Sequence, residues 1–183
     1  LSNVPYMKKK YSFPKIKLDE SLIASSKIDF WKKDKVIIAG MTKRLEAYYS
    51  KEPLALGVGI YGIYEFSKFH PLFLLSIINS NFLTYYLVSE FKDKHLAGGY
   101  LAINKSTIEE LPIVEISIKK QEPYIDKATN MLTLNKELQG ISSKFQRTLR
   151  RKFPEELEKL PRKLQDWYEL SYTNFIKELK KKK

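Results

Sequence analysis

The strongest periodic signal along the chain is a run of apolar residues between His70 and Phe91. Its apolar positions recur every three to five residues, as on one face of a helix: Leu72, Leu75, Ile78, Phe82, Tyr86 and Phe91. Pro71 suits the first helical position, where a missing N–H costs nothing. The polar triplet 79–81 interrupts the run with side chains that compete for backbone hydrogen bonds. The pattern predicts two helices with a break between them.

The segment that follows changes period and contains turn signals. Gly98 and Gly99 permit a tight turn into a strand over 100–103. Ser106 and Glu109 have the spacing of a capping box on one helical turn, which Pro112 ends. The segment Leu-Pro-Ile at 111–113 is then expected to be a strand. The predicted order is helix, glycine turn, strand, short capped helix and strand.

Two β-branched runs lie upstream, at 35–41 and 45–49, and predict a pair of strands. The residues 40–44 between them are expected to form a turn. Lys43 and Arg44 stand side by side on that turn, where they could clamp a phosphate. Arg44 could also bind a guanine edge with two hydrogen bonds. A solvated turn without a ligand would have the same sequence, so both interpretations stay open.

The string GVGIYG at 57–62 matches the glycine pattern of dinucleotide-binding loops. That site requires a helix after the glycines and an acidic residue about 20 positions on. Strand-like residues follow instead, at 63–66, and no acidic residue lies between Glu65 and Glu90. We therefore interpret the glycines as places for a bulge in a strand, or for a close approach of the backbone to DNA.

From Gln121 onward the pattern becomes that of a long helix. Apolar residues repeat every seven positions at Tyr124, Met131, Leu138 and Phe145, which is typical of a coiled-coil-like seam. Gly140 is a weak point in it. After Pro161 a last helix is expected, with one apolar face formed by Leu164, Trp167, Tyr168, Phe175 and Leu179. Two antiparallel helices would bury both apolar faces against each other.

Composition narrows the class of partner. The 183 residues carry a net charge of +12, which favours polyanionic partners, although the lysines could also serve only solubility. The absence of cysteine fits a reducing cytoplasm. No apolar run reaches the ~18 residues of a membrane span, and no signal peptide is recognisable. The leading Leu1 and the closing lysines suggest a piece of a longer polypeptide.

No catalytic or metal-binding constellation can be assembled from the sequence. Glu90 and Lys92 resemble half of a nuclease site, but they come at a helix end without a partner carboxylate. His70 and His95 have no neighbours at metal-ligand spacing. We therefore expect no catalytic centre, no cofactor site and no metal site in this chain.

The segments 77–80 (Ile-Ile-Asn-Ser), 98–100 (Gly-Gly-Tyr) with Ile103, and 111–113 (Leu-Pro-Ile), together with the strands at 35–49, carry a resemblance. The region 28–118 resembles the C-terminal specificity domain of TaqI-like DNA adenine methyltransferases and of fused restriction-modification enzymes. It is more distantly similar to the target recognition domains of type I specificity subunits.

The resemblance implies an α+β chain with three parts: a lead-in segment at 1–27, a DNA target recognition domain at 28–118, and a helical coiled-coil-like extension at 119–183. It also implies a sequence-specific reader of double-stranded DNA. The parent enzyme would methylate adenine with S-adenosylmethionine bound on an N-terminal catalytic domain absent here, and would use Mg²⁺ if a nuclease is fused to it.

The expected DNA contacts combine cations, aromatic side chains and the glycine turn. They are Lys43, Arg44, Tyr61, Tyr64, Lys94, His95, Gly98, Gly99, Tyr100 and Lys105. Two other interpretations stay open. The chain could be a fragment of a type I specificity subunit, which would have a second recognition domain in the full gene. It could also be a helical protein-interaction module without DNA binding.

Overall fold

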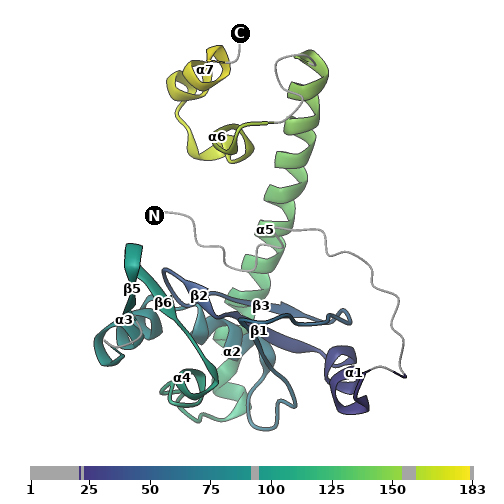
Figure 1. Cartoon of the computed structure of the whole chain (residues 1–183), viewed down its shortest axis with the longest axis vertical. Coiled ribbons are helices and arrows are strands. Elements are labelled where there is room, and N and C mark those ends of the chain that lie inside the picture. The colour runs from purple at the N-terminus through teal and green to yellow at the C-terminus, as the bar shows by residue number, and fades with distance from the viewer. Residues whose placement is uncertain (1–20, 22, 92–94, 154–159, 182–183) are drawn as a thin grey trace. The chain divides into compact units, whose positions relative to one another are not determined.

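In the computed structural model the chain is an α+β protein made of two compact units, Leu1–Leu132 and Thr133–Lys183 (Figure 1). The structure describes residues 21, 23–91, 95–153 and 160–181. Lys92 and Lys94, the lead-in residues 1–20 and the last two of the closing lysines, 182 and 183, therefore lie outside the described residues.

The first unit is built on an antiparallel sheet of three strands in the order β3-β1-β4. The strands are β1 (Lys35–Ala39), β3 (Ala47–Ser50) and β4 (Ile60–Ile63). Val36 and Ile38 of the central strand are fully buried. Opposite residues of antiparallel strands share a face, so Ala47 and Tyr61 lie on the same face as Ile38. The two strands predicted at 35–49 are thus confirmed, with the second displaced by two residues.

The third strand starts inside the glycine string and ends earlier than its sequence suggested. β4 stops at Ile63, and Glu65 adopts a φ of 60°, which breaks the extended run. Gly62 is required by packing within the protein, because a Cβ there would lie 2.8 Å from the ring of Phe30 and 3.0 Å from Leu56. Phe30 belongs to α1 (Ser25–Lys32).

The C-terminal end of α1 is joined to the sheet by a buried lysine. Lys35 is fully buried, and its ammonium group donates to the carbonyl oxygens of Trp31, at 2.9 Å, and of Lys33. These carbonyls belong to the last turn of the helix, which leaves its acceptors without helical donors. Burial lowers the pKa of Lys35 from its ordinary value.

The two predicted core helices and the break between them are confirmed. They are α2 (Pro71–Ile78) and α3 (Asn81–Glu90), bent by 58° relative to each other. Ser80 caps α3 by accepting from the Leu83 N–H at 3.1 Å. The expected buried face is wrong at Phe82, which is 67% exposed, because the bend rotates α3 and buries Leu83 and Leu87 instead.

The start of α2 depends on a neutral histidine. His70 is the N-cap of the helix, and its Nδ1 accepts from the Leu72 N–H at 3.2 Å. The His70 N–H in turn donates to the side chain of Gln121 at 2.8 Å. Burial, and to a lesser extent the charge of Lys51, lowers the pKa of His70. The ring nitrogen is therefore kept available as an acceptor at neutral pH.

Asn79, in the break between α2 and α3, completes the edge of the first sheet. Its side chain is buried; Oδ1 accepts from the Ala47 N–H at 3.0 Å, and Nδ2 donates to the Ala47 carbonyl at 3.1 Å and to the Leu75 carbonyl at 2.9 Å. The amide thus makes with Ala47 the two-way bond that a residue of a neighbouring strand would make.

A second sheet has the strand order β2-β6-β5, with β2 (Met41–Thr42), β5 (His95–Leu96) and β6 (Tyr100–Ala102). The turn predicted at 40–44 is confirmed only in part: the chain bends at Gly40, Lys43 and Arg44, but after Gly40 it continues directly into β2. Gly40 permits this because its N–H donates to the Gly59 carbonyl at 2.8 Å, so close that a Cβ would lie 2.5 Å from that oxygen. The predicted glycine turn and the strand after it are confirmed.

The short helix that follows is α4 (Lys105–Glu109), and the predicted capping box at Ser106 is wrong. Asn104 is the N-cap, and its Oδ1 accepts from the Thr107 N–H at 3.0 Å. Asparagine is at least as good an N-cap as serine, so the helix begins one residue before Ser106. The segment 111–113, expected to be a strand, is not one in the structure, although Leu111 is buried.

A long helix, α5 (Ile118–Lys152), begins in the first unit and continues into the second. Near its start Gln121 is fully buried. Its Oε1 accepts from the His70 N–H, and its Nε2 donates to the carbonyls of Lys68 and Ile116 at 2.9 and 3.0 Å. Of the predicted seam, Met131 packs against the first core and Phe145 against the core of the second unit, whereas Tyr124 is 42% exposed.

The second unit packs the end of α5 against α6 (Arg162–Gln165) and α7 (Tyr172–Lys180). Its core is formed by Leu149, Leu160 and Leu164, and the rings of Phe145 and Trp167 lie 4.3 Å apart. The single last helix predicted after Pro161 is wrong. Leu170 is extended, and Ser171 caps a new helix by accepting from the Asn174 N–H at 3.3 Å. The apolar face is therefore divided among α6, the 3-10 helix η4 (Trp167–Glu169) and α7.

Among the described residues no single helix is both long and apolar enough to cross a membrane. The bent pair α2 and α3 passes such a test by length and composition only.

Candidate nucleic-acid interface

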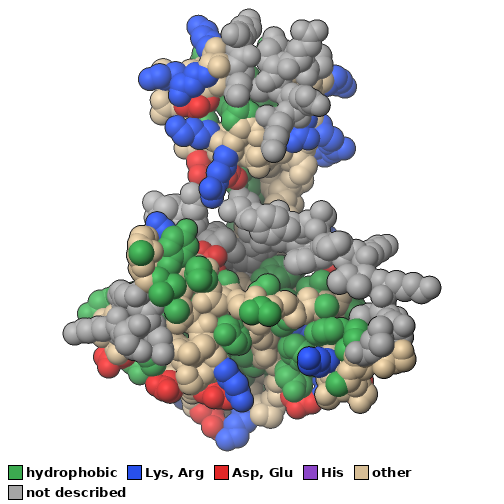
Figure 2. Space-filling model, viewed as in Figure 1, with side chains coloured by type: hydrophobic (Ala, Val, Ile, Leu, Met, Phe, Trp, Pro, Cys, Tyr) green, Lys and Arg blue, Asp and Glu red, His purple; other side chains and the backbone are tan. Residues whose placement is uncertain are grey.

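The second sheet has one buried face and one exposed face. Leu101 and its partner Thr42 are opposite each other in the register and are buried. The alternate positions point the other way: Met41 is 67% exposed, Tyr100 41% and Leu96 40%. Figure 2 shows hydrophobic side chains gathered over β5 and β6. We refer to Met41, Leu96 and Tyr100 as the exposed face of the second sheet.

Lys43 adds a positive charge to this exposed face. It follows β2 directly, its side chain is exposed, and its ammonium nitrogen lies 5.3 Å from the centre of the Tyr100 ring. At this distance the cation is attracted by the ring. The structure thus brings together two of the sequence-predicted contacts, a cation and an aromatic ring, on a short sheet.

The glycine turn forms the end of the same sheet. Gly98 and Gly99 both have a φ of 75°, a conformation that other residues rarely adopt, and they connect β5 to β6. His95 pairs with Leu101 through the backbone of β5. Lys94 and the side chain of His95 lie outside the described residues, so their part in the site stays a prediction.

Arg44 follows Lys43 in sequence, but its side chain goes elsewhere. Its Nη2 donates to Oδ1 of Asn81 at 2.9 Å and to the carbonyl of Asn79 at 3.4 Å. The guanidinium group is therefore held at the break between α2 and α3. Its role as a reader of base edges stays a prediction, and the structure adds a structural role for it.

The remaining candidates lie apart from the exposed face of the second sheet. Tyr61 shares a sheet face with buried Ile38 and packs against the first core. The Tyr64 ring lies 4.9 Å from that of Phe30, which links it to α1. Lys105 forms an ion pair of 3.5 Å with Glu109 on α4. DNA contacts at these three residues stay predictions.

Met41 was missed as a contact residue by sequence reasoning. Met41 was assigned to a turn, so the alternation across Met41 and Thr42 was not used, although an exposed and a buried residue in succession is the signal of a half-buried strand. Within the described residues no group of three or more His, Cys, Asp or Glu side chains is placed to hold a metal ion.

Two family models match the chain. Residues 117–183 match the domain of unknown function DUF8810. Residues 5–113 match the TaqI-like C-terminal specificity domain. No curated protein matches the chain. Since the second match spans more than half of the chain and contains both sheets, α2, α3 and α4, the chain belongs to the family of TaqI-like C-terminal specificity domains.

Proposed function

We propose that the exposed face of the second sheet contacts duplex DNA and selects its sequence. The observation that carries this proposal is the match to a specificity domain over residues 5–113, which contains Lys43 and Tyr100 on one exposed sheet. A specificity domain is the DNA-recognising part of a restriction-modification enzyme.

The chemistry of the exposed face suits the major groove. That groove admits a narrow β-ribbon, and each base pair presents a distinct pattern of donors, acceptors and methyl groups there. Tyr100 and Met41 offer apolar surface for a thymine methyl group, and the Tyr100 hydroxyl can donate to or accept from a base edge. Lys43 is a point charge suited to a phosphate. In this proposal Lys43 contributes affinity and Tyr100 contributes selectivity.

A second proposal concerns the enzyme of which this domain would be a part. We infer that the chain is joined to a catalytic domain that methylates adenine with S-adenosylmethionine in the cytoplasm, and that a fused nuclease would use Mg²⁺. The specificity-domain match supports fusion to a catalytic domain. An adenine methyltransferase must hold the duplex while one base leaves the stack, and holding the duplex is the task that the specificity domain would perform. Sequencing the reading frame around the chain tests the inference, since a catalytic methyltransferase domain should be encoded there.

The binding proposal is tested by selection from a library of randomised duplexes. The chain is incubated with the library, bound DNA is sequenced, and a short enriched site is expected. Tyr100→Ala should reduce the enrichment, by about 1–3 kcal/mol of discrimination if it makes a good base contact. Lys43→Ala should preserve the enriched site and flatten the salt dependence of affinity by about one unit.

Lys51, exposed after β3, provides the matched control. Lys51→Ala removes the same charge from the first unit and should change neither the enriched site nor, beyond a small effect, the salt slope. A library without any enriched sequence, or enrichment that Tyr100→Ala leaves intact, would contradict the assignment of selectivity to this face.

A further inference from the structure

Positive charge is concentrated in the second unit. Residues 133–183, fewer than a third of the chain, hold 14 of its 33 Lys and Arg residues but 7 of its 21 Asp and Glu residues. The unit therefore carries +7 of the total net charge of +12. No acidic residue occurs between Glu137 and Glu155, so the last four turns of α5 are free of negative side chains.

Within these turns the cations are arranged on one side of the helix. Lys144, Arg147, Thr148 and Arg151 line a hollow of about 320 Å³ on the surface of α5. At about 100° per residue they lie opposite Phe145 and Leu149, which face the core of the unit. We call these four residues the basic ridge. All three cations are exposed.

The basic ridge is not used by the fold. Within the described part of the chain none of its three cations forms an ion pair; Arg147 makes only a hydrogen bond of 3.4 Å to the Ser143 carbonyl of its own helix. Charges at a helix C-terminus stabilise the helix only within its last turn. That explanation covers Arg151 but not Lys144 or Arg147, which come earlier.

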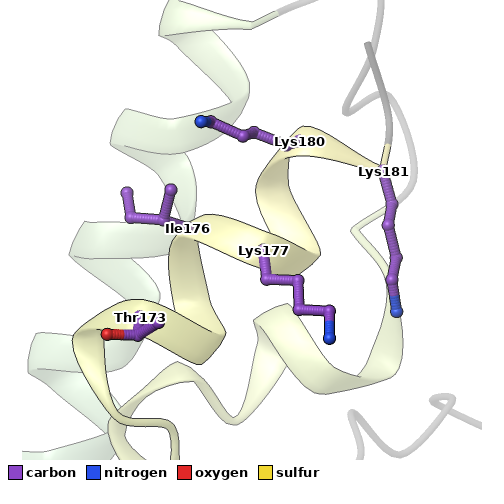
Figure 3. Close-up of a pocket in the computed structure, with 5 residues that line it drawn as sticks. All are labelled: Thr173, Ile176, Lys177, Lys180 and Lys181. Carbon is purple, nitrogen blue, oxygen red and sulfur yellow. The ribbon is translucent and has the colours of Figure 1, made fainter.

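The lysines of α7 differ from the basic ridge in having an acidic neighbour, Glu178. Figure 3 shows Lys177, Lys180 and Lys181, which line one hollow on the surface of α7. Glu178 accepts from Lys181 at 2.8 Å and from Lys163 at 3.4 Å, which neutralises part of this surface. The two sets of cations therefore differ in charge compensation: those on α5 form no ion pair with another described residue, whereas those on α7 are partly neutralised by Glu178.

We propose that the basic ridge binds the phosphate backbone of duplex DNA, as a contact independent of base sequence and separate from the exposed face of the second sheet. The proposal rests on the proposed function, which makes duplex DNA the partner. The ridge rises about 10 Å from Lys144 to Arg151, and one strand of duplex DNA carries a charge about every 3.4 Å along the axis. Three cations at this spacing can neutralise about three phosphates.

The expected effect follows from the release of counterions. Each neutralised phosphate contributes about 0.9 to the slope of log affinity against log salt concentration. The triple variant Lys144→Ala, Arg147→Ala, Arg151→Ala should therefore flatten the slope by about two to three units. Alanine has the highest helix propensity, so α5 should persist, which circular dichroism checks.

The experiment uses the whole chain, a mixed-sequence duplex of about 30 base pairs, and fluorescence anisotropy at a series of salt concentrations. The control is the triple variant Lys177→Ala, Lys180→Ala, Lys181→Ala, which removes the same three charges from α7. Preserved helicity, with a loss of slope in the ridge variant at least twice that in the α7 variant, supports the proposal. The enriched site found in the library selection should be the same in both variants.

Two results would contradict the proposal that the basic ridge binds the DNA backbone. An unchanged slope in the ridge variant excludes the ridge as a phosphate contact, and equal losses in the two variants assign the effect to net charge alone. A ridge that instead contacts a protein partner would give the first of these results. The proposed function fails in another way: the wild-type chain then binds no duplex, or library selection enriches no sequence.

Discussion

Replacing Asn79 tests whether a single side-chain amide completes the first sheet. Asn79→Ala leaves the Ala47 N–H and carbonyl without their partner in a buried place; the Leu75 carbonyl keeps its bond from the Asn79 backbone N–H at 3.2 Å. Each orphaned group costs about 1–3 kcal/mol, so the free energy of unfolding should fall by about 2–5 kcal/mol.

Asn79→Asp has nearly the same shape and separates hydrogen bonding from packing. Its second oxygen would face the carbonyls of Ala47 and Leu75, where the amide nitrogen now donates. The ionised form is disfavoured, so the folded-state pKa of the new carboxyl should rise above about 3.9. Because the carboxyl has a higher pKa in the folded than in the unfolded state, the free energy of unfolding of this variant falls as pH rises through the folded-state pKa. This variant should therefore be closer to wild type at about pH 4 than at pH 7.

The assay is urea unfolding of the first unit. The chain has two tryptophans, Trp31 in the first unit and Trp167 in the second, so a Trp167→Phe background makes Trp31 the reporter. Asn81→Ala is the control, since Asn81 is exposed and loses only its bond to Arg44, and it should cost under about 1 kcal/mol. A cost below 1 kcal/mol for Asn79→Ala, or an Asp variant insensitive to pH, would refute the reasoning.

Three further predictions use the same assay. Gln121→Ala leaves three backbone groups without their partner and should cost at least about 3 kcal/mol; a loss under 1 kcal/mol would show that water replaces the amide. The wild-type chain should lose stability as pH falls from about 6.5 through the lowered pKa of His70, whereas His70→Asn, which keeps a capping oxygen, should lack this dependence. Gly62→Ala should cost about 1–3 kcal/mol by its clash with Phe30, whereas Gly57→Ala, in open space, should be neutral.

The elements that the sequence predicted well are those with strong local signals. Pro71 and the polar triplet at 79–81 mark the limits of α2 and α3, and the two glycines before Tyr100 mark a turn, because these residues restrict or free the backbone wherever they occur. Local reasoning failed at Ser106, where a competing cap two residues upstream started the helix earlier.

What could not be predicted depends on residues far apart in the sequence. Asn79 could be identified as a helix breaker, but not as the partner of Ala47, 32 positions away. In the same way, Met41 is a strand residue because it pairs with β6, some 60 residues later in the chain. Of the ten candidate contacts, the structure brings Lys43 and Tyr100 together, and no spacing rule links these two positions. Tertiary pairing, which no local pattern encodes, decided these cases.

The buried amine of Lys35 can report how often α1 separates from the sheet of the first unit. An amine-reactive reagent acylates exposed lysines within the native state, but the Lys35 amine is fully buried and hydrogen-bonded to the end of α1. Its modification therefore has to wait until α1 separates from β1, and the rate of acylation at this one position measures the opening equilibrium under native conditions. Mass spectrometry of the acylated chain would follow that motion without any engineered probe.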